Sequence, residues 1–300
     1  MRHAIESRGL TRMYGRAVGV VGIDLDVHRG ESFGFLGPNG SGKTTFIRLA
    51  LGLIRPTAGA VALMGHDAGG DRMAALGEVG YLPGELGLYP RLTGERTLDA
   101  LARLHPRPPS ERGRLCAALE LDQAALRRRV REYSRGMKQK LGLVAALQHD
   151  PPVMILDEPT SGLDPVIQAR LLEWLASRAT AGRTVFFSSH VLAEVEELCD
   201  RVAMIRDGRL LFTGPLAELR RGHTRTVEVQ FAEPVDPARY AVAGVSAVEV
   251  EGLRHRFALA GDPKPLLAAL AALPVADVAI ERASLEDAFR DLYEGPPPAT

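Results

Sequence analysis

The sequence is poor in cysteine and has no long hydrophobic run. Its two cysteines, Cys116 and Cys199, are too few and too far apart for a disulfide scaffold or a thiolate metal site, which favours a reducing compartment. The longest apolar run, Leu266–Leu273, is far shorter than the roughly 18 residues of a membrane-spanning helix. Residues 1–14 contain no apolar core of a signal peptide. We therefore expect a chain that is neither secreted by that route nor membrane-spanning.

The sequence also has no excess of charge of one sign. Lysine and arginine total 37, aspartate and glutamate also total 37, and the formal net charge is zero. Because no global electrostatic field then draws the protein to nucleic acid, we expect no nucleic-acid partner. The arginine run at residues 127–129 is predicted to be a solvated helix end. With 46% hydrophobic and 25% charged residues and no internal repeat, the composition is typical of a folded globular protein.

Short apolar runs alternate with helical patterns over the first two thirds of the chain. Continuous apolar segments predict buried strands at Ser32–Leu36, Val153–Leu156 and Thr184–Phe187. A helix is expected between the last two, at Pro165–Thr180, and this order predicts a parallel sheet of the α/β class. The other predicted elements are strands at Val20–Val27 and Ala60–Met64, a helix from Lys43 to about Leu53, and helical residues from Thr93 to about Arg131.

Two domains are expected, because 300 residues is about twice a common domain length. Residues 1–222 are predicted to form the large domain, with a helical insert over about residues 88–150. The pattern changes after Gly222, where a small α+β domain is predicted for residues 223–300. Its predicted elements are strands at 226–231, 247–250 and 256–260 and a helix at 265–273.

A phosphate-binding loop follows the strand at Ser32–Leu36. Residues 37–44 read Gly-Pro-Asn-Gly-Ser-Gly-Lys-Thr, which satisfies the pattern G-x-x-x-x-G-K-S/T between a strand and a helix. Glycines let backbone N–H groups converge on phosphate oxygens, and the helix N-terminus adds partial positive charge. We expect Lys43 to reach the terminal phosphates and Thr44 to ligate Mg²⁺.

Two adjacent acids, Asp157 and Glu158, follow the strand at Val153–Leu156. Successive strand residues point to opposite sides, so the two carboxylates can serve different purposes. Asp157 is predicted to join the Mg²⁺ shell, and Glu158 to act as the base that polarises the attacking water. Adjacent acids at a strand end would alone be equally compatible with a solvated turn, and the upstream phosphate loop favours the catalytic interpretation.

Three further segments give the sequence a family resemblance. Tyr133–Gln139 precedes the acidic pair, Ser161–Asp164 follows it, and His190 ends the next predicted strand. This order resembles that of the ATP-binding-cassette (ABC) ATPases, namely Walker A, signature, Walker B, D-loop and switch histidine. The resemblance covers residues 1 to about 220. It implies the fold of the P-loop NTPase ABC cassette, with a mixed sheet core and a helical subdomain, and the cofactors ATP and Mg²⁺.

The resemblance also implies roles for individual residues. Tyr14, which is expected before the first strand, matches the aromatic residue that stacks on adenine, although a half-buried core tyrosine is the alternative. His190 would hold the γ-phosphate and the catalytic Glu158 in line, and Asp164 belongs to the D-loop. The implied nucleotide-binding residues are Tyr14, Gly37, Pro38, Asn39, Gly40, Ser41, Gly42, Lys43, Thr44 and Thr45. The implied signature residues, acting on the nucleotide of a partner, are Ser134, Arg135, Gly136 and Met137.

The sequence departs from the family pattern at two motifs. In the signature, the common L-S-G-G-Q keeps only its Ser and second Gly, at Ser134 and Gly136, which can still offer a hydroxyl and an open N–H at a helix N-terminus. At the position where most cassettes carry a Mg²⁺-contacting Gln, this chain has Gly84. Either water completes the Mg²⁺ shell or Glu85 supplies a carboxylate oxygen, and we favour water.

In the family the nucleotide lies between two cassettes, and this chain carries both halves of such a site. We therefore expect a head-to-tail homodimer. The residues Ser284–Tyr293 resemble the S-L-E-x-x-F ending of ABC-2 type exporter subunits, which implies an exporter of drugs, antibiotics or lipid-linked substrates. A separate transmembrane permease would then hold the chain at the cytoplasmic face of the cell membrane, docking against the helical insert and the loop 81–88. The alternative is a soluble ABC ATPase that acts on DNA or the ribosome.

Overall fold

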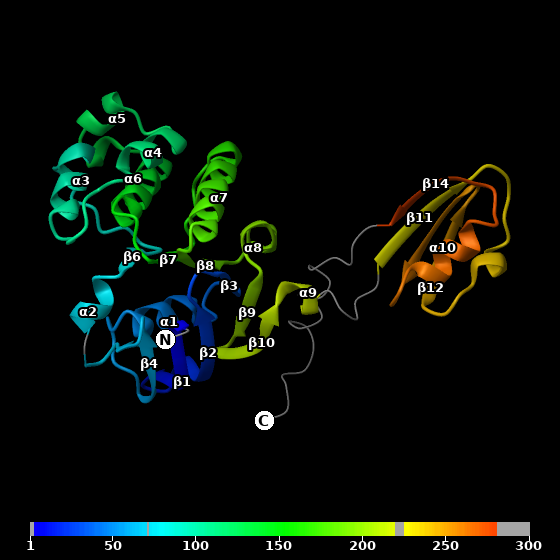
Figure 1. Ribbon diagram of the computed structural model, residues 1–300, viewed down its shortest axis with the longest axis horizontal. Coiled ribbons are helices and arrows are strands. Elements are labelled where there is room, and N and C mark those ends of the chain that lie inside the picture. Colours follow the sequence, from blue (N-terminus) through cyan, green and yellow to red (C-terminus); the bar gives the residue numbers. More distant parts are fainter. Residues whose placement is uncertain (1–2, 71, 220–224, 281–300) are drawn as a thin grey trace. The chain divides into compact units, whose positions relative to one another are not determined.

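Three strands with continuous apolar sequence lie at the centre of the fold (Figure 1). The computed structural model describes residues 3–70, 72–219 and 225–280, and strands β3 (Ser32–Leu36), β7 (Val153–Asp157) and β8 (Thr184–Ser189) are buried at every residue. They pair in parallel within a six-stranded sheet of order β10-β9-β3-β8-β7-β6. The predicted parallel sheet is therefore confirmed. Its other strands are β6 (Val79–Leu82), β9 (Arg201–Arg206) and β10 (Arg209–Pro215).

Helices pack against this sheet, and a left-handed glycine determines where the first of them ends. Helix α1 (Lys43–Ala50) contacts β7 as well as strands of the second sheet. It was expected to reach about Leu53 but ends at Ala50, because Gly52 takes a left-handed conformation (φ 63°) that terminates helices. The remaining helices on the sheet are α7 (Pro165–Thr180), at its predicted bounds, and α8 (Leu192–Leu198).

A second, antiparallel sheet has the order β2-β1-β4-β5. Its strands are β1 (His3–Tyr14), β2 (Ala17–His28), β4 (Ala58–Leu63) and β5 (His66–Asp67). The expectation that Tyr14 precedes the first strand is wrong, because Tyr14 is the last residue of β1. Register shifts along β1 and a left-handed Gly9 (φ 55°) interrupt the alternation by which a strand is predicted.

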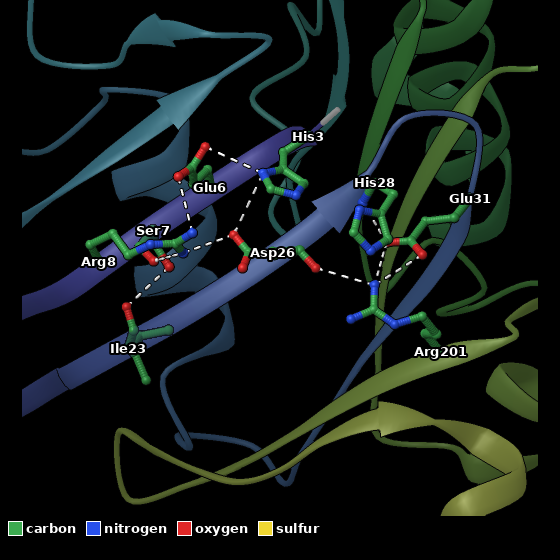
Figure 2. Close-up of polar contacts among 9 residues, drawn as sticks. All are labelled: His3, Glu6, Ser7, Arg8, Ile23, Asp26, His28, Glu31 and Arg201. Carbon is green, nitrogen blue, oxygen red and sulfur yellow. Dashed lines mark hydrogen bonds and ion pairs between the residues drawn. The ribbon is translucent and has the colours of Figure 1, made fainter. Parts of the chain in front are cut away.

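Charged side chains join the beginning of β1 to the end of β2 (Figure 2). Arg8 lies 3.0 Å from a carboxylate oxygen of Glu6 and 2.8 Å from one of Asp26, while His3 Nδ1 lies 3.4 Å from the other Glu6 oxygen. His3, Glu6 and Asp26 are close enough to be cation ligands, but Arg8 already neutralises both carboxylates. We therefore interpret the cluster as a surface charge network that supports the pairing of β1 with β2.

The predicted helical insert consists of short helices between β6 and β7 (Figure 1). They are α3 (Gly94–Ala102), α4 (Arg112–Ala118), α5 (Gln123–Arg127), the 3₁₀ helix η1 (Val130–Glu132) and α6 (Arg135–Leu147). A further short helix, α2 (Arg72–Leu76), precedes β6. Among the described residues, no helix combines the length and apolar character needed to span a membrane.

The chain divides into two compact units, of which the first ends at Gly214 and the second begins at Pro215. The boundary predicted after residue 222 lies outside the described residues and stays a prediction. The second unit contains an antiparallel sheet of order β12-β13-β11-β14, whose inner face buries Val227, Phe231, Tyr240 and Phe257. Its elements are α9 (Leu216–Leu219), β11 (Arg225–Phe231), η2 (Pro237–Tyr240), β12 (Val245–Glu251), β13 (Arg254–Leu259), α10 (Lys264–Leu270) and β14 (Val275–Ile280).

Candidate nucleotide-binding site

The phosphate loop connects β3 to α1, and close backbone packing fixes its shape. Gly40 and Gly42 have φ angles of 81° and 112°, which only glycine adopts without strain. A Cβ atom at Gly42 would lie 2.5 Å from the Gly19 carbonyl oxygen, and one at Gly37 would lie 2.7 Å from Ser41 Oγ. Both positions therefore exclude larger residues, and the loop backbone can turn its N–H groups toward one point.

Lys43, the first residue of α1, is almost completely buried, with 5% of its side chain exposed. Its ammonium donates to the carbonyl oxygens of Gly37 (2.6 Å) and Pro38 (3.2 Å). It also lies 3.3 Å from Glu158 Oε1. The positive charge is thus held beside the loop by three oxygen atoms, which an incoming phosphate oxygen can replace.

Asp157 is positioned by two hydroxyl groups. Thr44 Oγ1 donates to one carboxylate oxygen (2.7 Å), and Ser188 Oγ donates to the other (2.6 Å). The Ser188 hydroxyl also accepts from the backbone N–H of Glu158 (3.2 Å). Sequence reasoning assigned no role to Ser188, because its partners come from another strand. The side chains of Thr44 and Asp157 thereby present hard oxygen atoms at one place.

Glu158 turns away from the strand because its backbone is left-handed, with φ 50°. This conformation costs a non-glycine residue about 1–2 kcal/mol. In this conformation Glu158 Oε1 lies between Lys43 Nζ (3.3 Å) and His190 Nδ1 (3.2 Å). The structure thus brings together Lys43, Glu158 and His190, the three residues expected around the γ-phosphate, and places His190 just after β8.

A pocket of about 210 Å³ lies over the phosphate loop. Tyr14 forms one wall, with 45% of its surface exposed, and the guanidinium of Arg12 lies 4.8 Å from the centre of its ring. This exposure contrasts with a core tyrosine and leaves the ring available for stacking on a flat ligand. Sequence reasoning missed Arg12 because β1 itself was not predicted. The lining also includes the predicted residues Pro38, Asn39, Gly40, Gly42, Lys43, Thr44 and Thr45, with Glu158.

The signature residues do not line this pocket. Ser134 is the N-cap of α6, and its hydroxyl accepts from the backbone N–H of Met137 (3.2 Å). Arg135 donates to Ser161 Oγ in the D-loop (3.0 Å), and a Cβ atom at Gly136 would lie 2.7 Å from the Gly162 carbonyl oxygen. The signature therefore packs directly against the D-loop of its own chain. Asp164 caps α7 by accepting from the backbone N–H of Ile167 (3.1 Å).

Gln139 fastens the signature helix to the segment that follows β7. Its side-chain amide donates to the carbonyl oxygen of Pro159 (2.9 Å) and lies 3.4 Å from that of Glu158. Because Gln139 is buried, this is a rigid connection between α6 and the acidic pair. Sequence reasoning gave Gln139 no separate role, since its partners lie about 20 residues away along the chain.

Gly84 lies beside Asp157, where the family resemblance expects a Gln. A Cβ atom at Gly84 would be 3.4 Å from Asp157 Oδ2, an ordinary contact distance. Glu85 is exposed and makes no ion pair with another described residue. Burial, followed by the negative charge of Asp157, raises the pKa of Tyr81 on the adjacent strand β6. Water in place of the missing side chain, with Glu85 as the alternative Mg²⁺ ligand, stays a prediction.

Comparisons with known proteins agree with this geometry. Residues 20–161 match the family described as ABC transporter. An uncharacterized ABC transporter ATP-binding protein of Nostoc is 42% identical over 72% of this chain, and the match spans 65% of that relative's length. The bacitracin transport ATP-binding protein of Bacillus licheniformis is 36% identical over 78% of this chain and 76% of its own. The Nod factor export ATP-binding protein I of Burkholderia orbicola is 36% identical over 95% of both chains.

Solved structures show the same fold. The structure of an ATP-binding subunit of an ABC transporter superimposes with a TM-score of 0.67 and 31% identity, over 72% of this chain and 92% of that one. The shared region corresponds in extent to the first unit, which contains the phosphate loop, the acidic pair and the signature. The chain therefore belongs to the ABC transporter family and carries its ATP-binding cassette.

Proposed function

We propose that this chain is the ATP-hydrolysing subunit of an ABC-2 type exporter, acting as a head-to-tail homodimer on a separate transmembrane permease. One observation carries the hydrolytic part of the proposal. Glu158 Oε1 lies within 3.3 Å of both Lys43 Nζ and His190 Nδ1. A carboxylate beside the phosphate-binding lysine is in position to accept a proton from water attacking the γ-phosphate.

The donor set fits Mg²⁺, which prefers hard oxygen ligands. Thr44 Oγ1 and Asp157 Oδ2, 2.7 Å apart, are the atoms that would hold the ion. Ser188 would keep the carboxylate oriented through its other oxygen. When bound, Mg²⁺ would neutralise the charge that develops on the transferred phosphoryl group. The phosphate loop and Lys43 would orient the phosphates. Tyr14 would provide the wall against which the adenine ring stacks.

The homodimer is supported by the separation of the two halves of the site. Ser134 and Gly136 lie outside the phosphate-loop pocket of their own chain, at the start of α6. A second cassette that approaches head to tail would bring its α6 N-terminus, with partial positive charge, to the phosphates. Two equivalent composite sites would result from this symmetry.

The export part of the proposal rests on the relatives and on an apolar groove. Relatives named for bacitracin transport and Nod factor export favour an antibiotic or lipid-linked cargo. A groove of about 310 Å³ separates the loop 81–88 from the helical insert, and we call it the docking groove. The residues that define it here are Tyr81, Pro83, Leu86, Leu88, Leu101 and Leu104. Such a surface suits a helix of the permease, which would hold the chain at the cytoplasmic face of the membrane.

Two neighbouring histidines complete the docking groove. The ring centroids of His105 and His149 lie 3.5 Å apart, with the ring planes tilted by 33°. Burial, with a smaller contribution from His105, lowers the pKa of His149 to about 4. His149 is therefore neutral near pH 7 and leaves the groove largely apolar. Tyr81 lines the groove and also lies on the strand beside Asp157, so it connects the groove to the nucleotide site.

Hydrolysis is tested with Glu158→Gln. Removing the general base should slow ATP turnover by about 100-fold or more, while ATP binding persists. An ATP-bound dimer should then accumulate on size-exclusion chromatography with Mg²⁺. Glu173→Gln is the matched control, because Glu173 is an exposed acid on α7. Near-normal turnover of Glu158→Gln would remove Glu158 from the role of base.

Docking is tested by two substitutions of equally exposed side chains. Leu104, in the docking groove, is 82% exposed, and Met73, on α2 outside it, is 81% exposed. Leu104→Asp should prevent co-purification of the chain with its permease from detergent-solubilised membranes, because it places an unpaired charge in an apolar contact. Met73→Asp should leave co-purification intact. Equal recovery of the permease with both variants would contradict the proposed docking groove.

A further inference from the structure

The helical insert is strongly basic, although the chain as a whole is neutral. Residues 88–150 contain 13 lysines or arginines and 7 aspartates or glutamates, a net charge of +6, in a chain whose formal charge is zero. Several of these cations are paired, such as Arg112 with Asp99 and Arg107 with Glu78. The excess is concentrated elsewhere, around the turn between α5 and η1.

Backbone pairing gathers five exposed arginines at this turn. The backbone N–H of Val130 donates to the Leu92 carbonyl oxygen (2.9 Å), and that of Arg131 donates to the Pro90 carbonyl oxygen (3.0 Å). Segment 90–93 therefore runs alongside residues 129–131. In Figure 1, α5 lies at the end of the helical insert that is farthest from the sheet β2-β1-β4-β5 of the same unit. We call this surface the arginine strip, and its residues are Arg91, Arg127, Arg128, Arg129 and Arg131.

The described residues offer little to neutralise the arginine strip. Glu132 lies 4.0 Å from Arg128 and 3.9 Å from Arg131, both at the limit of an ion pair. Arg91, Arg127 and Arg129 make no ion pair with any described residue. Clustered like charges repel one another and contribute nothing to folding, so the strip is not explained by the stability of the insert.

The arginine strip begins where the docking groove ends. The loop 81–88 continues directly into Tyr89, which is 67% exposed, and then into Arg91. A permease seated in the docking groove would therefore bring the strip toward the membrane surface. This step rests on the proposed export function. Protein surfaces that contact lipid headgroups are rich in exposed tyrosine and in basic residues, and this surface has both.

We propose that the arginine strip binds the phosphate groups of anionic phospholipids beside the docked permease. A guanidinium can donate two parallel hydrogen bonds to a phosphate, so the five clustered arginines suit a surface of phosphate groups. The amphipathic Tyr89 favours a lipid surface over an acidic protein segment, because its polar tip and apolar ring suit the interface. The strip thus orients the cassette on the membrane in addition to the contact in the docking groove.

The test is binding of the full chain to vesicles of phosphatidylcholine with and without phosphatidylglycerol, measured by co-sedimentation. Wild type should bind only the anionic vesicles, and added salt should weaken binding through screening. The variant Arg91→Gln/Arg127→Gln/Arg129→Gln should bind about 100-fold more weakly. The control is Arg209→Gln/Arg239→Gln/Arg256→Gln, which removes the same charge from exposed arginines elsewhere and should bind as wild type does.

The proposal is overturned if wild type fails to sediment with anionic vesicles, if both triple variants lose binding equally, or if the strip variant binds like wild type. Strip-dependent binding of polyglutamate without binding to vesicles would point instead to an acidic protein partner, and would also overturn it. ATP turnover without lipid should be equal in wild type and the strip variant. An inactive wild type would contradict the proposed hydrolysis, and vesicle binding would still be measured independently.

Discussion

The phosphate loop and the signature would both contact nucleotide in the proposed homodimer, but their side chains have different surroundings within the chain. Lys43 is buried and has three oxygen neighbours within its own chain. Ser134 is exposed, and among the described residues its hydroxyl accepts only the Met137 N–H that it caps. The phosphate-loop lysine therefore has its polar contacts within the chain. The signature serine is positioned at the start of helix α6 and is open to a second molecule. This difference supports the proposed head-to-tail homodimer, in which each nucleotide site would need two copies of the chain.

The two motifs are nevertheless mechanically connected. Gln139 ties the signature helix to the carbonyl oxygen of Pro159, next to Glu158. Arg135 and Gly136 pack against Ser161 and Gly162 of the D-loop. A partner that binds the signature would thus act on the segment that carries Glu158, the proposed general base. This arrangement can couple closure of a dimer to the geometry of hydrolysis.

The largest effect is expected at the phosphate loop. Lys43→Ala removes the buried ammonium that would contact the terminal phosphates and leaves Glu158 without its charged neighbour. ATP affinity should fall by about 100-fold, given the strength of charge-assisted hydrogen bonds to phosphate. Fluorescent nucleotide titration would measure it, with Lys264→Ala of the second unit as the control. Unchanged affinity would show that the phosphate loop is not the binding element.

A smaller and different effect is expected at the signature. Gly136→Ala would place a methyl group 2.7 Å from the Gly162 carbonyl oxygen, which must then move. ATP affinity should stay as in wild type, while turnover should fall by about tenfold, as after loss of about 1.4 kcal/mol of transition-state stabilisation. Gly113→Ala is the matched control, because a Cβ atom at this position in α4 meets nothing within 4 Å. Reduced ATP affinity in Gly136→Ala would erase the distinction between the two motifs.

The sequence predicted the phosphate loop and the acidic pair because each depends on consecutive residues. Glycines at 40 and 42 and a lysine at 43 specify the loop wherever a strand leads into a helix. The parallel strands were likewise predicted from their continuous apolar runs. Local pattern is sufficient for these elements, since their structure is determined by neighbours in the chain.

The side-chain contacts that position the site residues could not be predicted from the local sequence pattern. Ser188 and Gln139 act through partners on other elements, and Arg12 lies on a strand whose bulges hide its alternation. In the second unit, β14 (Val275–Ile280) was missed because four of its six residues are exposed and its apolar pattern is weak. The predicted ending at residues 284–293 lies outside the described residues.

The most direct test of the two-motif account mixes two inactive variants. Lys43→Ala and Ser134→Ala should each lose most ATP turnover as homodimers, and Thr93→Ala controls for loss of a helix cap of the same geometry. In a mixed dimer, one composite site would retain both Lys43 and Ser134. The account predicts that mixing restores part of the turnover. No recovery above the two separate variants, or full turnover by Ser134→Ala alone, would contradict it.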